Sequence, residues 1–123
     1  MSSVHKFKGD TNKFGWEGVD GQDLKIKGIA SAVKHVLIGD ADNAPNMIMR
    51  FFELSPGGHS RLETHPQEHE VIVIQGKGKI QIEENYYDVE PYDAVFIEGG
   101  TLHQFSNPYD EPFGFICVIP KNV

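Results

Sequence analysis

The stretch at residues 57–78, GGHSRLETHPQEHEVIVIQGKG, decides the fold of this chain, because it places histidines and glutamates in β-type sequence between turn glycines. Glu63 and His65 are two residues apart, so an extended strand projects both side chains from one face. Pro66 removes a ladder donor and predicts a turn. After that turn His69 can face the first two side chains. The stretch therefore predicts two short strands that bring three candidate metal ligands together.

A fourth candidate ligand lies far along the chain. The sequence at 98–107, EGGTLHQFSN, places His103 after a glycine-rich turn, at the start of another β-type run. A ligand so distant in sequence can join the others only in a closed fold. Three imidazoles and one carboxylate suit Mn, Fe, Co, Ni, Cu or Zn and do not suit a Ca or Mg site. We therefore expect one divalent transition metal per chain, held by Glu63, His65, His69 and His103.

The first of these stretches resembles the first motif of the cupin superfamily. That motif runs glycine, five residues, His-x-His, three or four residues, glutamate, six residues, glycine. In this chain the matching positions are Gly57, Glu63, His65, His69 and Gly76. Glutamate and histidine have exchanged places relative to the family pattern, so the ligand set keeps its composition.

The second stretch resembles the second cupin motif at Gly100, His103 and Asn107, although Tyr92 and Glu98 stand at family glycine and proline positions. The chain further resembles small single-domain manganese-binding cupins of the conserved-barrel type. This resemblance implies a double-stranded β-helix, or jelly-roll barrel. It also implies Mn as the favoured metal, with Fe, Ni, Zn, Co or Cu as alternatives.

The rest of the sequence predicts an all-β fold. Turn residues recur at short intervals, and no window shows a 3.6-residue period with helix caps. We expect an N-terminal arm at 1–21, with a short strand near 14–16, and one barrel domain at 22–123. The expected strands lie at 24–29, 32–38, 47–54, 59–65, 69–75, 79–83, 86–89, 94–97, 103–107 and 113–119, with a turn at 55–58.

Composition narrows the classes of partner. The chain has 123 residues, of which 39% are apolar, enough for one domain with a modest core. Acidic residues outnumber basic ones 18 to 11 without a basic cluster, so nucleic acid is not an expected partner. There is no long apolar run, no apolar signal-peptide centre and only one cysteine, so we expect a cytoplasmic protein that does not enter membranes.

Four further side chains are candidates for lining the ligand pocket. Arg50 lies in an apolar strand and needs a buried partner; we favour a carboxylate over the alternative, a substrate anion. Phe52 and Phe105 either line the pocket or pack in the core. Cys117 alternates with apolar residues, so its thiol either lies close to the metal or serves as a small buried group. His59 is expected at the rim.

Three functions remain open at this point. The cupin resemblance implies a Mn- or Fe-dependent, dioxygenase-like oxidoreductase that acts on a small organic substrate in the barrel. A metal-dependent isomerase or lyase is the second possibility, with Glu63 as a base rather than a ligand. A non-catalytic protein that binds a metal or small ligand is the third. The resemblance also implies a homodimer, for which residues 24–38 offer an apolar edge.

Overall fold

The computed structural model describes residues 2–121; Met1 of the expected arm and residues 122–123 of the expected barrel domain lie outside the described residues. Within this range the regular structure is almost entirely β. The strands are β1 Gly21–Asp23, β2 Ala30–Ile38, β3 Met47–His59, β4 His69–Gln75, β5 Gly78–Ile82, β6 Asn85–Val89, β7 Ala94–Ile97, β8 His103–Ser106 and β9 Phe113–Pro120. The longest helix in the described range is a 3-10 turn at Asp40–Asp42, so no helical segment there could span a bilayer.

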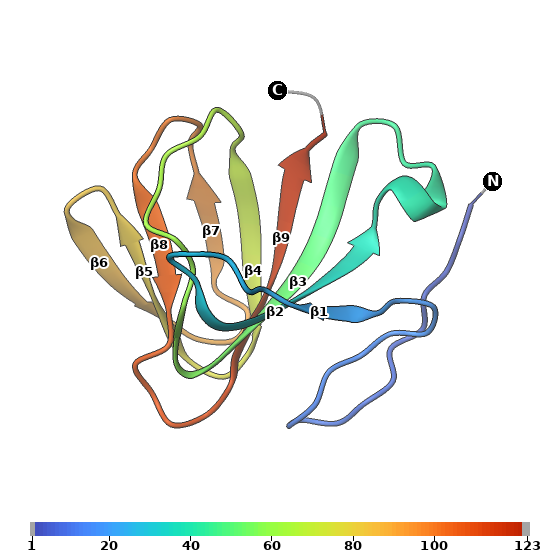
Figure 1. Ribbon diagram of the computed structural model, residues 1–123, viewed down its shortest axis with the longest axis horizontal. Helices are drawn as coiled ribbons and strands as arrows, with labels where there is room; N and C mark the ends of the chain where they lie inside the picture. The colour runs from blue at the N-terminus through green and yellow to red at the C-terminus, as the bar shows by residue number, and fades with distance from the viewer. Residues whose placement is uncertain (1, 122–123) are drawn as a thin grey trace.

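The strands pair antiparallel in one sheet that curls around an interior (Figure 1). The hydrogen-bonded order is β6-β5-β8-β3-β9-β4-β7, with β2 also paired to β3 and β1 paired to β2. The all-β prediction is therefore confirmed. Most predicted strands are present with ends that differ by a residue or two, and β3 continues five residues beyond the expected end.

The additional residues of β3 form a corner between the two halves of the barrel. We expected a turn at 55–58, but this segment belongs to β3. The strand pairs with β9 as far as Leu54 and with β8 at His59. Between these two partners Gly57 has a φ of 83°, a value that glycine adopts without strain. The predicted turn is thus a bend that transfers one strand from one half to the other.

The predicted strand at 59–65 is not formed, although its backbone follows β8. Ser60 N donates to Phe105 O at 2.8 Å, and Glu63 and His103 exchange two backbone hydrogen bonds of 3.1 and 3.0 Å. Between these hydrogen bonds the first segment advances three residues, from Ser60 to Glu63, while β8 advances only two, from Phe105 to His103. This extra residue produces a bulge, which interrupts the ladder.

The predicted strand at 24–29 is also wrong. Ile29 N donates to Ile26 O at 3.0 Å and closes a turn in which Gly28 has a φ of 91°. Leu24, Ile26 and Ile29 all line the interior cavity described below. This part of the expected dimer edge therefore contributes to the cavity wall.

Inward-facing side chains alternate along the strands. In β4 the odd-numbered residues 69, 71, 73 and 75 are buried, whereas Glu70 and Ile72 are exposed. This is the alternation of a strand with one face toward a core. In the interior, the ring of Phe115 stacks on Phe105 at 4.4 Å and on Phe52 at 5.6 Å between centroids. These rings fill the space next to the candidate site.

The N-terminal arm covers the outer face of β2 and β3. Phe14 stacks on Phe51 at a centroid distance of 5.5 Å, and Trp16 lies 5.0 Å from the same ring. Phe51 is fully buried as a result. Trp16 also forms an isolated β-bridge with Phe7, which is what remains of the short strand expected near 14–16. The arm thus shields the back of the strands whose other face carries the cavity.

Candidate metal centre

Three histidines from separate parts of the chain converge at one point. His69 is the first residue of β4 and His103 the first of β8, while His65 lies in the loop that precedes β4. Each offers a ring nitrogen, and these nitrogens all lie within 4.8 Å of one another. His69 and His103 are 7% and 4% exposed. The backbone bonds between Glu63 and His103 fix the loop against β8 and so hold His65 beside the other two rings.

The arrangement of nitrogens fits a transition metal. The Nε2 atoms of His65 and His69 are 2.9 Å apart. Two imidazole nitrogens bound at right angles to one ion, each about 2.1 Å from it, lie roughly 3.0 Å apart. His103 Nδ1 is 2.8 Å from the carbonyl oxygen of Thr101, so Nδ1–H donates to that oxygen and Nε2 keeps its lone pair. These three histidines are therefore positioned to bind a metal.

The electrostatic environment keeps His69 in the neutral form that a metal requires. Burial, together with the neighbouring charges of His103, Arg50 and His65, lowers the pKa of His69 to about 3. A neutral imidazole presents a lone pair, whereas an imidazolium cannot bind a metal.

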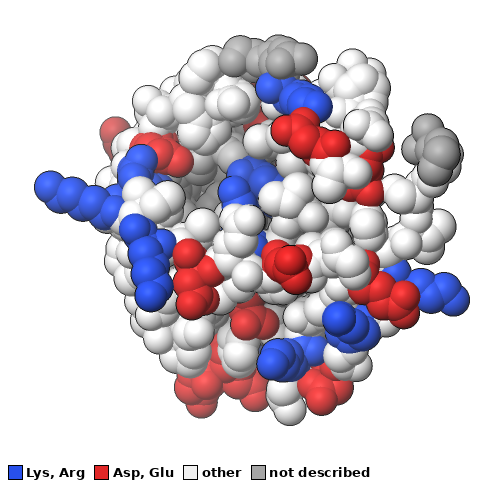
Figure 2. Space-filling model, turned by 45° about the vertical axis from the view of Figure 1, so that its right-hand side comes forward, with Lys and Arg blue, Asp and Glu red and all other residues white. Residues whose placement is uncertain are grey.

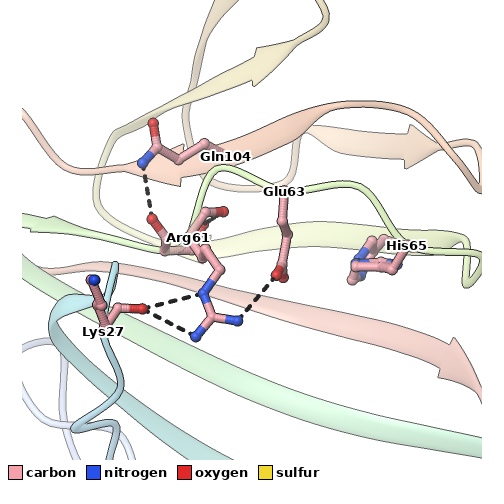
Figure 3. Close-up of polar contacts among 7 residues, drawn as sticks. Lys27, Arg61, Glu63, His65 and Gln104 are labelled. Carbon is pink, nitrogen blue, oxygen red and sulfur yellow. Dashed lines mark hydrogen bonds and ion pairs between the residues drawn. The ribbon is translucent and has the colours of Figure 1, made fainter.

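Glu63, the fourth expected ligand, does not lie in the histidine group. Its Oε2 atom is 3.7 Å from Nη1 of Arg61, and Figure 3 shows the carboxylate turned toward that guanidinium. Nε and Nη2 of Arg61 donate to the carbonyl oxygen of Lys27 at 3.2 and 3.0 Å. Arg61 therefore links Glu63 to the segment that contains the Gly28 turn. The Glu63 side chain is 39% exposed and borders the same cavity as the histidines.

The histidines open onto a cavity of about 300 Å³. Its walls come from β2, β3, β8, β9 and the start of β4, together with the segments before β2 and β4. All four candidate pocket residues, Arg50, Phe52, Phe105 and Cys117, line it. The remaining lining residues are Leu24, Ile26, Ile29, Ala32, Lys34, Leu54, Ser60, Arg61, Glu63, His65, Gln67, His69, His103, Phe115 and Ile119. His59 is not among them; its Nδ1 lies 2.9 Å from the carbonyl oxygen of Ser60.

A family model described as a cupin domain matches residues 50–119, which include the three histidines and the strands that carry them. The chain belongs to the cupin family. The predicted family and its jelly-roll barrel are therefore confirmed.

Relatives of this cupin align over most of its length. It is 37% identical over 116 residues to 1-methylthio-D-xylulose 5-phosphate methylsulfurylase of Rhodospirillum rubrum, covering 92% of this chain and 73% of the relative. A crystal structure of a cupin-2 domain from Rhodospirillum rubrum superposes with a TM-score of 0.83 at 35% identity, over 94% of this chain and 78% of that one. A cupin 2 conserved barrel protein from Rhodopseudomonas palustris gives 0.84 at 28% identity, over 97% and 81%.

Behind the histidines, the cupin cavity contains a thiol and a guanidinium. Sγ of Cys117 is 2.9 Å from Nδ1 of His69, and Nη2 of Arg50 donates to the same sulfur at 3.2 Å. Burial raises the pKa of the Cys117 thiol, and the charge of Arg50 opposes this shift. The thiol is therefore neutral near pH 7 and carries a proton into the site.

Arg50 has no carboxylate partner among the described residues. Its guanidinium lies over the ring of Phe52, 4.8 Å from the centroid, and its Nε atom is buried without a hydrogen-bond partner. The structural ion pair that we favoured from the sequence is absent from the described part of the chain. The alternative, an anion supplied by a substrate, stays open.

Sequence reasoning missed Lys34 as a cavity residue. Lys34 lies on β2 two residues from Ala32, and both side chains line the cavity. The sequence did contain a signal for Lys34, the same one that was noted for Arg50. Lys34 is a cation within a run of small and apolar residues, and it shares a strand face with a buried residue, so it could have been predicted to point inward.

Proposed function

We propose that this cupin is a metal-dependent enzyme that transfers a proton next to a carbonyl group of a small organic substrate. The observation that carries the proposal is the shared cavity. The three-histidine centre, the neutral thiol of Cys117 and the carboxylate of Glu63 all border the same volume of about 300 Å³. A cavity of that size accommodates one small ligand.

The metal is held by His65, His69 and His103 in this proposal, and Mn is favoured by the cupin resemblance. The nitrogen donors also suit Fe, Co, Ni, Cu and Zn. When bound, such an ion acts as a Lewis acid that polarises a carbonyl oxygen. Phe52 and Phe105 exclude water on the apolar side of the cavity.

The protein's own groups can move the proton. Glu63 acts as the base, and an oxygen of its carboxylate accepts the proton from the carbon beside the carbonyl. The C–H bond breaks, and its electron pair moves into a C=C bond as negative charge shifts onto the carbonyl oxygen. Cys117 S–H then donates its proton to a carbon of the C=C bond as the carbonyl re-forms, and solvent returns a proton to the Cys117 thiolate while Glu63 releases the proton it accepted. In this assignment Glu63 remains paired with Arg61 and is not a fourth metal ligand.

The relative from Rhodospirillum rubrum supports this choice of chemistry. It is named for 1-methylthio-D-xylulose 5-phosphate, and a xylulose has its carbonyl at the second carbon. The carbon that bears the methylthio group is therefore adjacent to a carbonyl, where enolisation is feasible. The alternative is the oxygen-dependent reaction implied by the cupin resemblance, and the experiment must distinguish it from proton transfer.

The test is hydrogen exchange in deuterated water. Metal-loaded protein is incubated with 1-methylthio-D-xylulose 5-phosphate, while NMR follows the hydrogens beside the carbonyl and an electrode follows dissolved O2. We expect metal-dependent deuterium incorporation without O2 consumption. Consumption of O2 in proportion to substrate would instead establish the oxygenase. Absence of both would favour a binding protein.

Variants assign the roles. Glu63→Gln should lower the exchange rate at least 100-fold while metal content is retained, because the amide cannot accept the proton. Glu68→Gln is the matched control, since Glu68 is exposed and does not line the cavity, and its exchange should be unchanged. Loss of metal from Glu63→Gln would show instead that Glu63 is a ligand.

We also propose a cytoplasmic location and a homodimer. A reducing compartment keeps the buried Cys117 thiol free, as the proposed proton transfer requires. The dimer is expected from the cupin resemblance, with β1 at the edge of the sheet and the exposed part of β2 as the available pairing surface.

A further inference from the structure

Two basic side chains enter the cavity from adjacent strands. Lys34 lies on β2 and Arg50 on β3. In the antiparallel register Lys34 is opposite Phe52, and Arg50 is opposite Val36. Lys34 and Arg50 are therefore diagonal neighbours on the inner face, where long side chains can reach one another. Burial lowers the pKa of Lys34, and the nearby charge of Arg50 contributes to this shift.

No carboxylate in the described part of the chain balances this pair. Neither Lys34 nor Arg50 has an acidic partner within 4.0 Å in residues 2–121. The acidic side chain that lines the cavity, Glu63, is paired with Arg61. Two partly buried like charges side by side destabilise a fold unless something of opposite charge joins them.

The cavity differs in charge from the molecule around it. The whole chain has a net charge of −7. The cavity, however, is lined by Lys34, Arg50 and Arg61 and by Glu63 as its acidic residue. Acidic and basic side chains are mixed over the face in Figure 2, and basic atoms also lie inside a hollow of that face. A local excess of positive charge in an acidic protein concentrates an anion at that position.

The packing of Arg50 leaves its guanidinium without a strong hydrogen-bond acceptor. Nη2 donates to the neutral sulfur of Cys117, a weak acceptor, and Nε is buried without a partner. A guanidinium binds the oxygens of a phosphate through two parallel N–H groups, and a nearby ammonium adds a point charge. The stack of Arg50 on Phe52 accounts for the position of one cation only, and it leaves Lys34 unexplained.

We infer that Lys34 and Arg50 form a subsite for the phosphate group of a phosphorylated substrate, whose carbonyl end faces the three histidines. The inference rests on the proposed function and names its substrate class as a small phosphate monoester. Two charges match the dianion that a phosphate monoester carries near pH 7. The relative from Rhodospirillum rubrum is named for a 5-phosphate, which agrees with this class.

The test uses inorganic phosphate as the probe and needs no turnover. Binding is measured by calorimetry and by 31P NMR, with both metal-loaded and chelator-treated protein. Wild type should bind phosphate in both forms. Lys34→Met should weaken binding roughly 10- to 100-fold, the amount expected for one charge-assisted contact. Lys79→Met is the matched control, because Lys79 pairs with Asp88 at 3.6 Å outside the cavity, and its affinity should equal that of wild type.

The subsite would be overturned by equal phosphate affinity in Lys34→Met and wild type, by binding only to the metal-loaded form, or by acetate binding as tightly as phosphate. Arg50→Met is a second variant for the same measurement. Because Arg50 touches Cys117, its folding is first checked by circular dichroism. If Arg50→Met does not fold, Lys34→Met alone decides the result. Exchange activity that persists without phosphate binding would reject the subsite alone. Phosphate binding without exchange would reject the proposed reaction alone.

Discussion

Asn107 connects three parts of the barrel through one buried side chain, and its replacement should lower the free energy of unfolding. It directly follows β8 and is 1% exposed. Its Nδ2 donates to the carbonyl oxygens of Leu54 and Glu111 at 2.8 and 2.7 Å, and its Oδ1 accepts from the backbone N–H of Tyr109 at 3.0 Å. Asn107→Ala removes all three contacts and leaves the Leu54 oxygen buried.

The magnitude follows from these contacts. The hydrogen bonds to Glu111 and from Tyr109 contribute about 1 kcal/mol net each, and leaving the buried Leu54 carbonyl unsatisfied costs about 1–3 kcal/mol. Asn107→Ala should therefore lower the free energy of unfolding by about 3–5 kcal/mol. For a domain of this size that corresponds to a fall in Tm of roughly 10–20 °C. Asn107→Asp keeps the shape but cannot donate to two carbonyl oxygens, so it should destabilise at least as much.

The assay is equilibrium urea unfolding followed by circular dichroism and tryptophan fluorescence. Asn85→Ala is the matched control, since Asn85 is exposed at the start of β6, and its effect should stay within about 0.5 kcal/mol. A loss below about 1 kcal/mol in Asn107→Ala, with an unchanged m-value, would refute the reasoning. Because β8 begins at His103, weaker metal binding should accompany the loss of stability.

Further predictions concern stability, the metal and assembly. His69 has a pKa of about 3 in the folded chain and about 6.5 when unfolded, so the unfolded state binds the extra proton between these values. The urea midpoint of metal-free protein should therefore fall as pH is lowered from about 6.5 to 3; if His69→Gln shows the same fall, another group is responsible. A methyl group at Gly78 would overlap the buried Phe113 ring, so Gly78→Ala should lose at least about 2 kcal/mol in the same assay, and a smaller loss would mean that the ring can move. His103→Ala should retain less than about one tenth of the wild-type metal by elemental analysis, because two imidazoles remain, whereas full retention would place the ion elsewhere. Sedimentation should give about twice the chain mass of 13.8 kDa, and a monomer would reject the dimer.

The sequence was sufficient to predict the direction of a side chain wherever that direction follows from a local period. Alternation along β4 places His69 on the inward face, and alternation along β9 places Cys117 on the same face as Phe115 and Ile119. Turn residues between short apolar runs were enough to predict the all-β class. The spacing around His65 and His103 was enough to suggest the cupin family.

The sequence was not sufficient where two strands must align. The bulge near Glu63 depends on how residues 59–65 register against β8, and a register is a property of two segments together. For the same reason the Glu63 carboxylate could be predicted beside the histidines, while in the folded chain it pairs with Arg61.

The sequence by itself determined the all-β class, the family and the three imidazoles, because a two-residue period and a motif spacing are properties of one segment. The tertiary structure alone decided that Lys34 joins Arg50 with no carboxylate partner for either within residues 2–121, and that a thiol lies against His69. These contacts depend on which strands become neighbours when the sheet closes. That choice is made by packing over the whole barrel, since no segment buries its apolar face alone.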